Sequence, residues 1–429
     1  MNLAVYPKHN SFKPSGFDWI GDVPVHWDVE KIGSMLTAVS EKNHPDLPLL
    51  SITREQGVIE RDVDDQESNH NFIPDDLSGY KLLRKGQFGM NKMKAWQGSY
   101  GVSAHTGIVS PAYFIFDFVR EVDPHFFNIA IRSKLYVSYF GSASDGVRVG
   151  QWDLNPARMR QIPILLPQLP EQRAIASFLD DKCAKIDEAV RIKEEQIKLL
   201  RERRQILIQQ AVTRGLNPDA PMKDSGIDWI DQIPAHWEVR RCKYLFREVN
   251  ERSEEGTEEL LSVSHTTGVT ARSDKNVYMF MAEDYTGSKL CRPGDIVINT
   301  MWAWMGALGV SDFTGIVSPS YGVYRPLRKD AFNRRFLEWL MRTTPFIEQY
   351  NKISTGLHSS RLRLYPHMFL RLPMAFPIRG EQDEIVMHVE EKAGKIEQAI
   401  SIKESQITTL KEYKTTLINA AVTGKIKVI

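Results

Sequence analysis

Two long segments of the chain carry apolar residues at alternating spacings of four and three. They cover residues 171–211, which contain no proline or glycine, and residues 381–421. A mean spacing of 3.5 keeps one apolar stripe facing a partner helix, so each segment is predicted to be a long helix of a coiled coil. Gly215 and Gly424 follow the stripes as helix stops. The predicted seam comprises Leu179, Ile186, Val190, Ile197, Leu200, Leu207, Val389, Ile396, Ile400, Ile407, Leu410 and Leu417.

The rest of the chain alternates between short strand-like runs and helical patches. PAYFIFDFV and GDIVIN are rich in β-type residues and bounded by turn-forming ones, whereas FNRRFLEWLMRT has a helical pattern. This mixture predicts the α+β class, with a twisted sheet in each body. The expected division is a first body at 1–168, a long helix at 169–214, a second body at 215–377, and a long helix with a tail at 378–429.

The sequence contains an internal repeat that covers both halves of the chain. SGFDWIGDVPVHW, which starts at Ser15, returns as SGIDWIDQIPAHW at Ser225, an offset of 225 − 15 = 210. GIVSPAY at 107–113 returns as GIVSPSY at 315–321, and Glu-Gln at 171–172 returns at 381–382. Repetition on this scale indicates two equivalent domains, but by itself it does not say what they bind.

Helix length predicts how the two long segments pair. About 43 residues at roughly 1.5 Å each make a rod about 65 Å long, whereas a body of about 160 residues is only about 40 Å across. The intervening body cannot carry the chain back along the rod, so the second helix is expected to run antiparallel to the first in an intramolecular coiled coil. An intermolecular coiled coil and an isolated charged rod are the alternatives. Basic residues interrupt the stripe at Lys193, Arg204, Lys403 and Lys414, where snorkelling stems are expected.

Composition narrows the classes of protein. The 429 residues carry 55 Lys+Arg against 54 Asp+Glu, a net charge of +1, which gives no support for broad, salt-driven nucleic-acid binding. Three scattered cysteines make a disulfide framework or a cysteine-rich zinc site improbable and fit a reducing cytoplasm. No apolar run reaches membrane-spanning length, and the start lacks the layout of a secretory signal, so a cytoplasmic protein without membrane contact is expected.

Catalytic motifs are missing from the sequence. It contains no GxxxxGK[ST] phosphate loop, no HExxH pattern, and no Asn-Pro-Pro-aromatic or Asp-Pro-Pro-aromatic run; the nearest match is Asn-Pro-Ala at 155–157. Carboxylates are abundant mainly on the long helices, where a solvated face is the simplest interpretation. We therefore expect no catalytic residues and no metal site.

Four features recur in the same order in both halves: SGxDWIxxxPxHW, a body, a proline-spaced segment, and Glu-Gln leading into the long helix. Over essentially the whole chain this order resembles the specificity subunits of Type I restriction–modification enzymes. The resemblance implies that each body is a target-recognition domain that reads one half of a bipartite DNA site. Because the two bodies differ in sequence, an asymmetric target is expected. A rod of about 65 Å limits the half-site separation to about 19 base pairs.

The same resemblance implies the partners. The long helices would set the spacer and dock two methyltransferase subunits, and further restriction and translocase subunits are possible partners. S-adenosylmethionine, ATP and Mg²⁺ are expected only on those partner subunits, with no cofactor bound directly by this chain.

Candidate DNA-contacting residues lie in loops that occupy equivalent places in the two bodies. Side chains that fork onto base edges, and basic or hydroxyl groups that reach phosphates, are the types that such contacts require. Tight turns with a buried tryptophan, or surface loops that diverge without function, explain the same pattern. The paired Trp-His motifs are expected to be packing elements. The candidates are Thr53, Arg54, Gln56, Asn91, Lys92, Lys94, Trp96, Arg148, Ser264, His265, Thr266, Thr267, Asn299, Thr300, Trp302, His358, Ser359, Ser360 and Arg361.

Two other classes of function stay open at this point. A protein-assembly scaffold with a coiled-coil stalk would explain the helices without any DNA-reading role. An enzyme with an unrecognised active site is the second possibility. Enrichment of particular sequences from a degenerate DNA library separates the specificity subunit from the scaffold.

Overall fold

The computed structural model describes residues 3–62, 73–146, 152–274, 284–356 and 362–429. The chain divides into two compact units, and the division passes through both long helices. Unit 1 comprises Met1–Glu194 and Lys403–Ile429, and unit 2 comprises Glu195–Ile402. The domain boundaries expected from the sequence instead separate whole helices from the bodies, and they stay a prediction.

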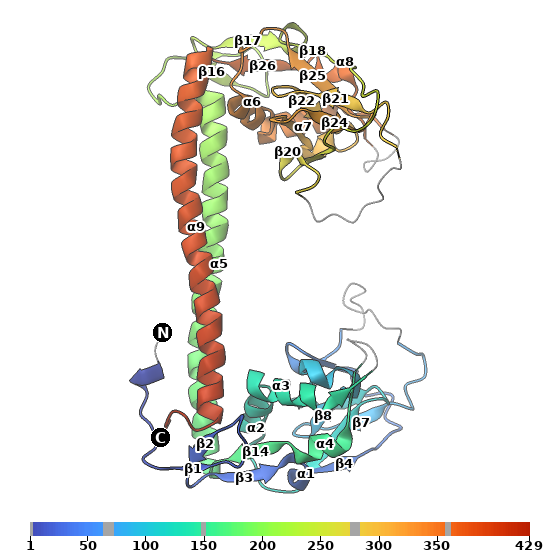
Figure 1. Ribbon diagram of the computed structural model, residues 1–429, viewed down its shortest axis with the longest axis vertical. Helices are drawn as coiled ribbons and strands as arrows, with labels where there is room; N and C mark the ends of the chain where they lie inside the picture. Colours follow the sequence, from blue (N-terminus) through green and yellow to red (C-terminus); the bar gives the residue numbers. More distant parts are fainter. Residues whose placement is uncertain (1–2, 63–72, 147–151, 275–283, 357–361) are drawn as a thin grey trace. The chain divides into compact units, whose positions relative to one another are not determined.

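The two long helices pack against each other within each unit (Figure 1). They are α5 (Leu169–Arg214) and α9 (Arg379–Val422). In unit 1, Asp187 of α5 accepts from Lys414 of α9 at 2.7 Å, and Lys193 donates to Gln406 at 2.7 Å. Positions rise along α5 as they fall along α9, so the pair is antiparallel. The predicted intramolecular pairing is confirmed.

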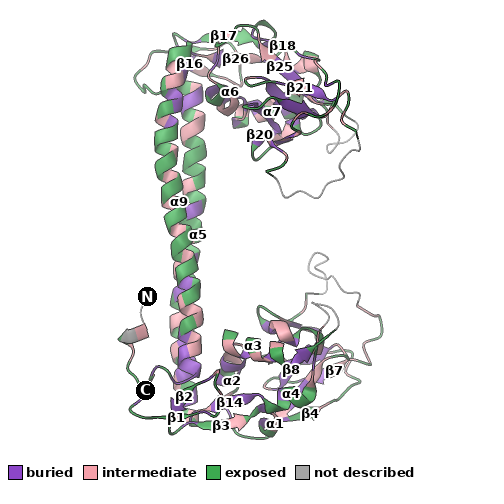
Figure 2. Ribbon diagram, viewed as in Figure 1, coloured by how far each residue is buried: buried purple, intermediate pink, exposed green. Residues whose placement is uncertain are grey.

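Unit 2 contains the other ends of the same two helices, again antiparallel. Ala211 and Val212, near the end of α5, share a hydrophobic core with Ile385 and Val389, near the start of α9. No predicted seam residue is exposed. Along both helices, buried and half-buried stretches alternate with exposed ones (Figure 2). The buried members are Leu179, Ile186, Val190, Ile197, Val389, Ile400, Leu410 and Leu417, and the half-buried ones are Leu200, Leu207, Ile396 and Ile407.

The body of unit 1 is built on a four-stranded antiparallel sheet in the order β4-β11-β8-β9. Two helices, α2 and α3, contribute Phe126, Phe127, Tyr136 and Phe140 to its core. The sheet strands are β4 (Leu36–Val39), β8 (Phe88–Met90), β9 (Tyr100–Val102) and β11 (Phe114–Phe118), and the helices are α1 (Ile32–Met35), α2 (Pro124–Ile131), α3 (Lys134–Ser142) and α4 (Pro156–Gln161), with 3-10 turns η1 (Leu3–Val5) and η2 (Lys92–Gln97). Paired short strands are β1 (Phe12–Pro14) with β2 (Asp22–Pro24), β3 (Asp28–Lys31) with β14 (Pro163–Leu166), β5 (Leu50–Thr53) with β6 (Gly57–Glu60), β7 (Lys81–Leu83) with β10 (Gly107–Val109), and β12 (Ser144–Asp145) with β13 (Asp153–Leu154).

The body of unit 2 repeats this topology. Its four-stranded sheet has the order β18-β25-β22-β23, which matches that of unit 1 strand for strand. The sheet strands are β18 (Phe246–Glu248), β22 (Ile296–Ile298), β23 (Leu308–Val310) and β25 (Gly322–Pro326), and the helices are α6 (Arg334–Met341), α7 (Thr344–Ile353) and α8 (Pro366–Phe369), with 3-10 turns η3 (Cys242–Tyr244) and η4 (Ala303–Met305). Paired short strands are β15 (Met222–Asp224) with β16 (Gln232–Pro234), β17 (Glu238–Arg241) with β26 (Pro373–Phe376), β19 (Leu261–Ser264) with β20 (Gly268–Ala271), and β21 (Lys289–Cys291) with β24 (Gly315–Val317). The α+β class predicted from the sequence is confirmed.

A buried glutamine attaches each body to its long helix. Gln172 accepts a hydrogen bond from the backbone of Asp123 at 2.8 Å and donates to Pro167 at 2.8 Å. Gln382 makes the equivalent bonds, accepting from Asn333 at 2.9 Å and donating to Pro377 at 2.9 Å. These bonds explain why glutamine recurs at this position near the start of both helices. Among the described residues, no helix is both long and apolar enough to cross a membrane.

Candidate nucleic-acid interface

A tight turn in each body carries the first group of candidate residues. The turn lies between β5 and β6 in unit 1 and between β19 and β20 in unit 2. A hydroxyl fixes each backbone: Thr53 accepts from the Gln56 amide at 3.1 Å, and Ser264 accepts from the Thr267 amide at 3.1 Å. The exposed side chains at the tips are Arg54, Glu55 and Gln56 in unit 1, where Arg54 pairs with Glu55 at 2.6 Å, and His265, Thr266 and Thr267 in unit 2.

In each body, an arginine at the end of a helix donates hydrogen bonds to the backbone of this turn. Arg132 donates to the carbonyl oxygens of Glu55 at 2.8 Å and of Tyr100, on β9, at 2.7 Å. Arg342 donates to the carbonyl oxygens of His265 at 2.6 Å and of Thr266 at 3.0 Å. A Cβ at Gly57, where φ is +77°, would lie 2.6 Å from the Arg132 guanidinium, so the close approach requires glycine.

Neither arginine is among the candidate residues predicted from the sequence. A signal was nevertheless present, because Arg132 and Arg342 stand at the repeat offset of 342 − 132 = 210. Their role depends on hydrogen bonds to backbone oxygens about 77 positions away along the chain. A side chain that recognises backbone leaves no partner motif in the sequence, so its function becomes visible only in the folded body.

The residue one helical turn before this arginine is charged in unit 2 but neutral in unit 1. In unit 2, Glu338 pairs with Arg342 at 3.0 Å, and burial raises the pKa of Glu338 above its usual value while Arg342 opposes that shift. The equivalent residue in unit 1 is Asn128, whose side-chain oxygen accepts from the Val102 amide at 2.9 Å. Unit 1 therefore uses a neutral amide where unit 2 uses a titratable carboxyl.

The second group of candidates begins with a buried asparagine in both bodies. Asn91 donates to the Tyr113 hydroxyl at 3.2 Å, and Asn299 donates to the Tyr321 hydroxyl at 2.9 Å. Burial raises the pKa of both tyrosines, which keeps the hydroxyls protonated. Thr300 is also buried and donates to the carbonyl of Ser320 at 2.9 Å. These side chains are engaged inside the bodies, and their predicted contact with DNA stays a prediction.

The neighbouring residues of this group are more accessible. In unit 1, Lys94 is exposed, Lys92 pairs with Asp153 at 3.2 Å, and Trp96 lies against Trp152 with ring centroids 5.3 Å apart. In unit 2, Trp302 is 49% exposed and its ring stacks on that of Trp304. An exposed indole of this kind suits stacking on an unpaired base.

Five further candidates fall outside the described residues. They are Arg148, His358, Ser359, Ser360 and Arg361. In unit 1 one residue links the two groups of candidates: Arg132 donates both to the first turn and to Tyr100, which pairs with Met90 next to Asn91.

This duplicated α+β architecture, with two equivalent bodies joined to a folded-back helix pair, is shared with known proteins. The chain is 24% identical over 312 residues to the type I restriction enzyme MjaVIII specificity subunit of Methanocaldococcus jannaschii, covering 69% of each chain. A chain in a structure of a type I restriction–modification system superposes with a TM-score of 0.66 at 15% identity, covering 93% of this chain and 98% of that one. The HsdS subunit of Thermoanaerobacter tengcongensis gives a TM-score of 0.52 at 16% identity, covering 94% and 98%. No family model matches the chain.

These similarities concern the whole repeated architecture, and the structural matches span almost all of both chains. The resemblance drawn from the repeated motifs is confirmed. The chain is related in sequence and in fold to the specificity subunits of type I restriction–modification enzymes.

Proposed function

We propose that this protein is a DNA-specificity subunit whose two bodies each read one half of a bipartite, asymmetric target. The sequence relationship to a specificity subunit and the duplicated fold support this role. They favour it over an assembly scaffold without DNA contact, because a scaffold has no need of two loop-bearing bodies that differ in their exposed side chains.

The observation that carries the proposal is a turn with one backbone design and two sets of displayed side chains. Arg132 donates to the carbonyls of Arg54 and Glu55, and Arg342 to the equivalent carbonyls of His265 and Thr266. The tips nevertheless present Arg54, Glu55 and Gln56 in one body and His265 with two threonines in the other. Arginine and glutamine fork onto guanine and adenine edges, whereas hydroxyls and histidine make other contacts. Two half-sites of different sequence require different side chains, and here such side chains stand on turns of the same backbone design.

A gel-shift selection from a degenerate double-stranded DNA library tests the role. The full chain is used both alone and with its methyltransferase subunits, at a fixed salt concentration, because binding to phosphates is strongly salt-dependent. We expect two short sequence stretches, separated by a constant spacer, to be enriched. If no sequence is enriched in either condition, the protein does not read DNA and the scaffold becomes the better explanation.

Partner docking is assigned to the helix pair. Ile192, Leu199 and Ile206 recur on α5 every seven residues, lie off the seam, and are exposed at 43%, 54% and 56%. An exposed apolar row of this spacing suits a protein partner, and we assign it to the two methyltransferase subunits. S-adenosylmethionine, ATP and Mg²⁺ belong, in this proposal, to those partners and to restriction subunits, and this chain performs no catalysis.

The same helices are proposed to set the spacer of the target. Inserting seven residues into both α5 and α9, in register, lengthens the pair by about 10 Å, which corresponds to about three base pairs. The selected spacer should grow by that amount. An unchanged spacer would refute the ruler while leaving DNA reading by the bodies intact.

A further inference from the structure

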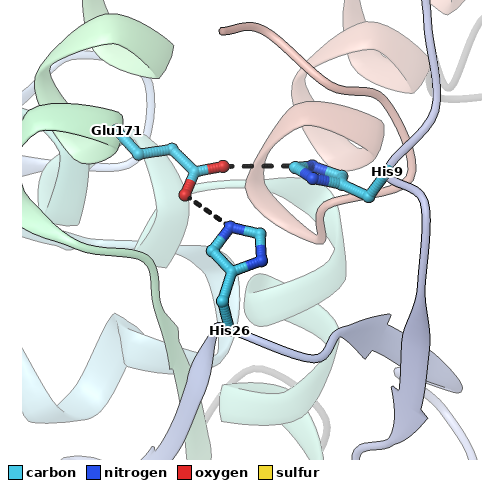
Figure 3. A group of neighbouring side chains, drawn as sticks. All are labelled: His9, His26 and Glu171. Carbon is cyan, nitrogen blue, oxygen red and sulfur yellow. Dashed lines mark hydrogen bonds and ion pairs between the residues drawn. The ribbon is translucent and has the colours of Figure 1, made fainter.

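Three side chains that are distant in sequence meet in unit 1 at the start of α5. Figure 3 shows the imidazoles of His9 and His26 directed toward the carboxylate of Glu171. His26 Nε2 lies 2.9 Å from one carboxylate oxygen, and His9 Nε2 lies 3.9 Å from the other. One nitrogen or oxygen atom from each of the three residues lies within 4.8 Å of the other two.

The buried edge of this cluster has an unused nitrogen. His9 is 9% exposed, and its Nε2 has no hydrogen-bond partner among the described residues, although it points at the Glu171 carboxylate. The indole nitrogen of Trp27 beside it likewise has none in the described part of the chain. A buried polar atom without a hydrogen-bond partner destabilises the folded state. The cluster therefore contains a nitrogen, His9 Nε2, for which the described residues supply no hydrogen-bond partner.

The equivalent place in unit 2 is satisfied differently. His236 contacts Glu381 at 2.7 Å, as His26 contacts Glu171, but the other oxygen of Glu381 accepts from the Trp237 indole at 3.0 Å. The residue equivalent to His9 is Asp219, at the offset 219 − 9 = 210. The His-Glu contact is thus part of the shared fold, whereas the second histidine and its approach to the other carboxylate oxygen are specific to unit 1.

We propose that His9, His26 and Glu171 form a site for a divalent transition-metal ion of the zinc class. Two imidazoles and one carboxylate are the ligand set of zinc sites that keep a further coordination position for water. A hollow of about 450 Å³, lined by these three residues with Asn10, Ser11 and Lys427, opens beside them and leaves room for that water.

The metal would join three parts of unit 1. His9 precedes β1, His26 lies between β2 and β3, and Glu171 is in the first turn of α5. One ion therefore fastens the beginning of the chain to the helix that carries the body. Lys427 lines the same hollow, and its positive charge opposes the binding of a cation. The site should accordingly bind more tightly when that charge is removed.

Isothermal titration calorimetry with Zn²⁺ on the chelator-treated full chain tests the site, with Co²⁺ absorption as a second readout of coordination. Wild type should bind one equivalent with release of protons. Affinity should fall in His9→Ala and His9→Gln by more than the roughly 10–100-fold that loss of a second-shell partner costs. Lys427→Met should bind more tightly. His236→Ala, which removes the matching histidine of unit 2, is the control and should bind like wild type.

Thermal unfolding with and without Zn²⁺ distinguishes a variant that has lost the metal site from one that has failed to fold. Zn²⁺ should raise the melting temperature of wild type and of His236→Ala, but not that of the two His9 variants. Zn²⁺ binding by wild type that is no tighter than binding by His9→Gln, with both variants folded, would overturn the site. So would a Co²⁺ spectrum without tetrahedral or five-coordinate bands. Neither result bears on DNA reading, which the library selection tests separately.

Discussion

The two bodies share one hydrogen-bonding frame but differ in the charges placed within it. Arg132 and Arg342 hold equivalent turns. On the central strands β11 and β25, however, the partners differ: in unit 1 Gln87 donates to Asp117 at 2.7 Å, whereas in unit 2 Arg325 donates to Asp295 at 2.8 Å. Asp295 occupies the place of Gln87, and Arg325 that of Asp117, at offsets of 208.

This difference shows what the duplicated fold fixes and what it leaves open. The frame requires an acceptor for the backbone amide of the preceding turn, which Gln87 provides to Arg84 and Asp295 provides to Arg292. Beyond that requirement, two pairs of side chains form the second hydrogen bond. In unit 1 the neutral amide of Gln87 donates to a carboxylate, and in unit 2 a guanidinium donates to the carboxylate of Asp295. The bodies have thus kept their geometry while changing their electrostatics, and the following experiments test how far the two solutions are equivalent.

The largest effect is expected from breaking the charged pair of unit 2. Arg325→Ala leaves Asp295, which is 1% exposed, without its cation. An uncompensated buried charge costs about 3–5 kcal/mol. The equivalent change in unit 1, Asp117→Ala, removes a single hydrogen bond and should cost about 1–3 kcal/mol. Urea unfolding of the full-length variants measures both losses of unfolding free energy. Equal losses would show that the charged pair of unit 2 contributes no more to stability than the neutral pair of unit 1.

Removal of the turn-holding arginines should loosen the turn of the altered body, with a larger loss of stability in unit 2, where Arg342 also pairs with Glu338. Arg132→Met and Arg342→Met each leave backbone carbonyls of a turn without their donor, at a cost of about 1–3 kcal/mol. Hydrogen exchange should show faster exchange at the turn of the altered body only. If one variant leaves its turn as protected as in wild type, then the shared-frame interpretation fails for that body.

Removal of the displayed side chains from one body at a time should separate the two half-sites. Arg54→Ala with Gln56→Ala should relax base preference in one half of the selected target, by about 1–3 kcal/mol for each side chain that forks onto a base edge. His265→Ala with Thr266→Ala should relax the other half. Lys85→Ala, a change at an exposed residue away from both turns, serves as the control. Relaxation of both halves by either pair would contradict independent reading.

The smallest effect concerns pH. The raised pKa of Glu338 means that its neutral form favours folding, so its contribution is full below the unfolded pKa and is lost as pH rises through the higher folded value. Glu338→Gln removes that dependence and mimics the neutral Asn128 of unit 1. The stability of the variant relative to wild type should therefore improve as pH rises from about 4 to 7. Asn128→Gln, the matched change in unit 1, should alter stability equally at both pH values.

The sequence by itself determined the repeat, the α+β class and the helix pair. The heptad stripe and the duplicated motifs are patterns of neighbouring positions, and helix pairing follows from rod length, so no tertiary information was needed. Tertiary structure alone decided the environment of the candidate residues. Asn91 and Asn299 look like reading residues in a loop, but both are buried against a tyrosine about 22 positions away.

The same limit explains the residues that the sequence analysis missed. Arg132 acts on carbonyl oxygens, which every residue possesses, so nothing in the sequence marks its partners. His9, His26 and Glu171 lack any metal-binding spacing, since 145 positions separate His26 from Glu171. Their meeting depends on the packing of the first segment of the chain against the start of a helix. Local periodicity is encoded in neighbouring residues, whereas contacts between distant side chains exist only once the body has folded.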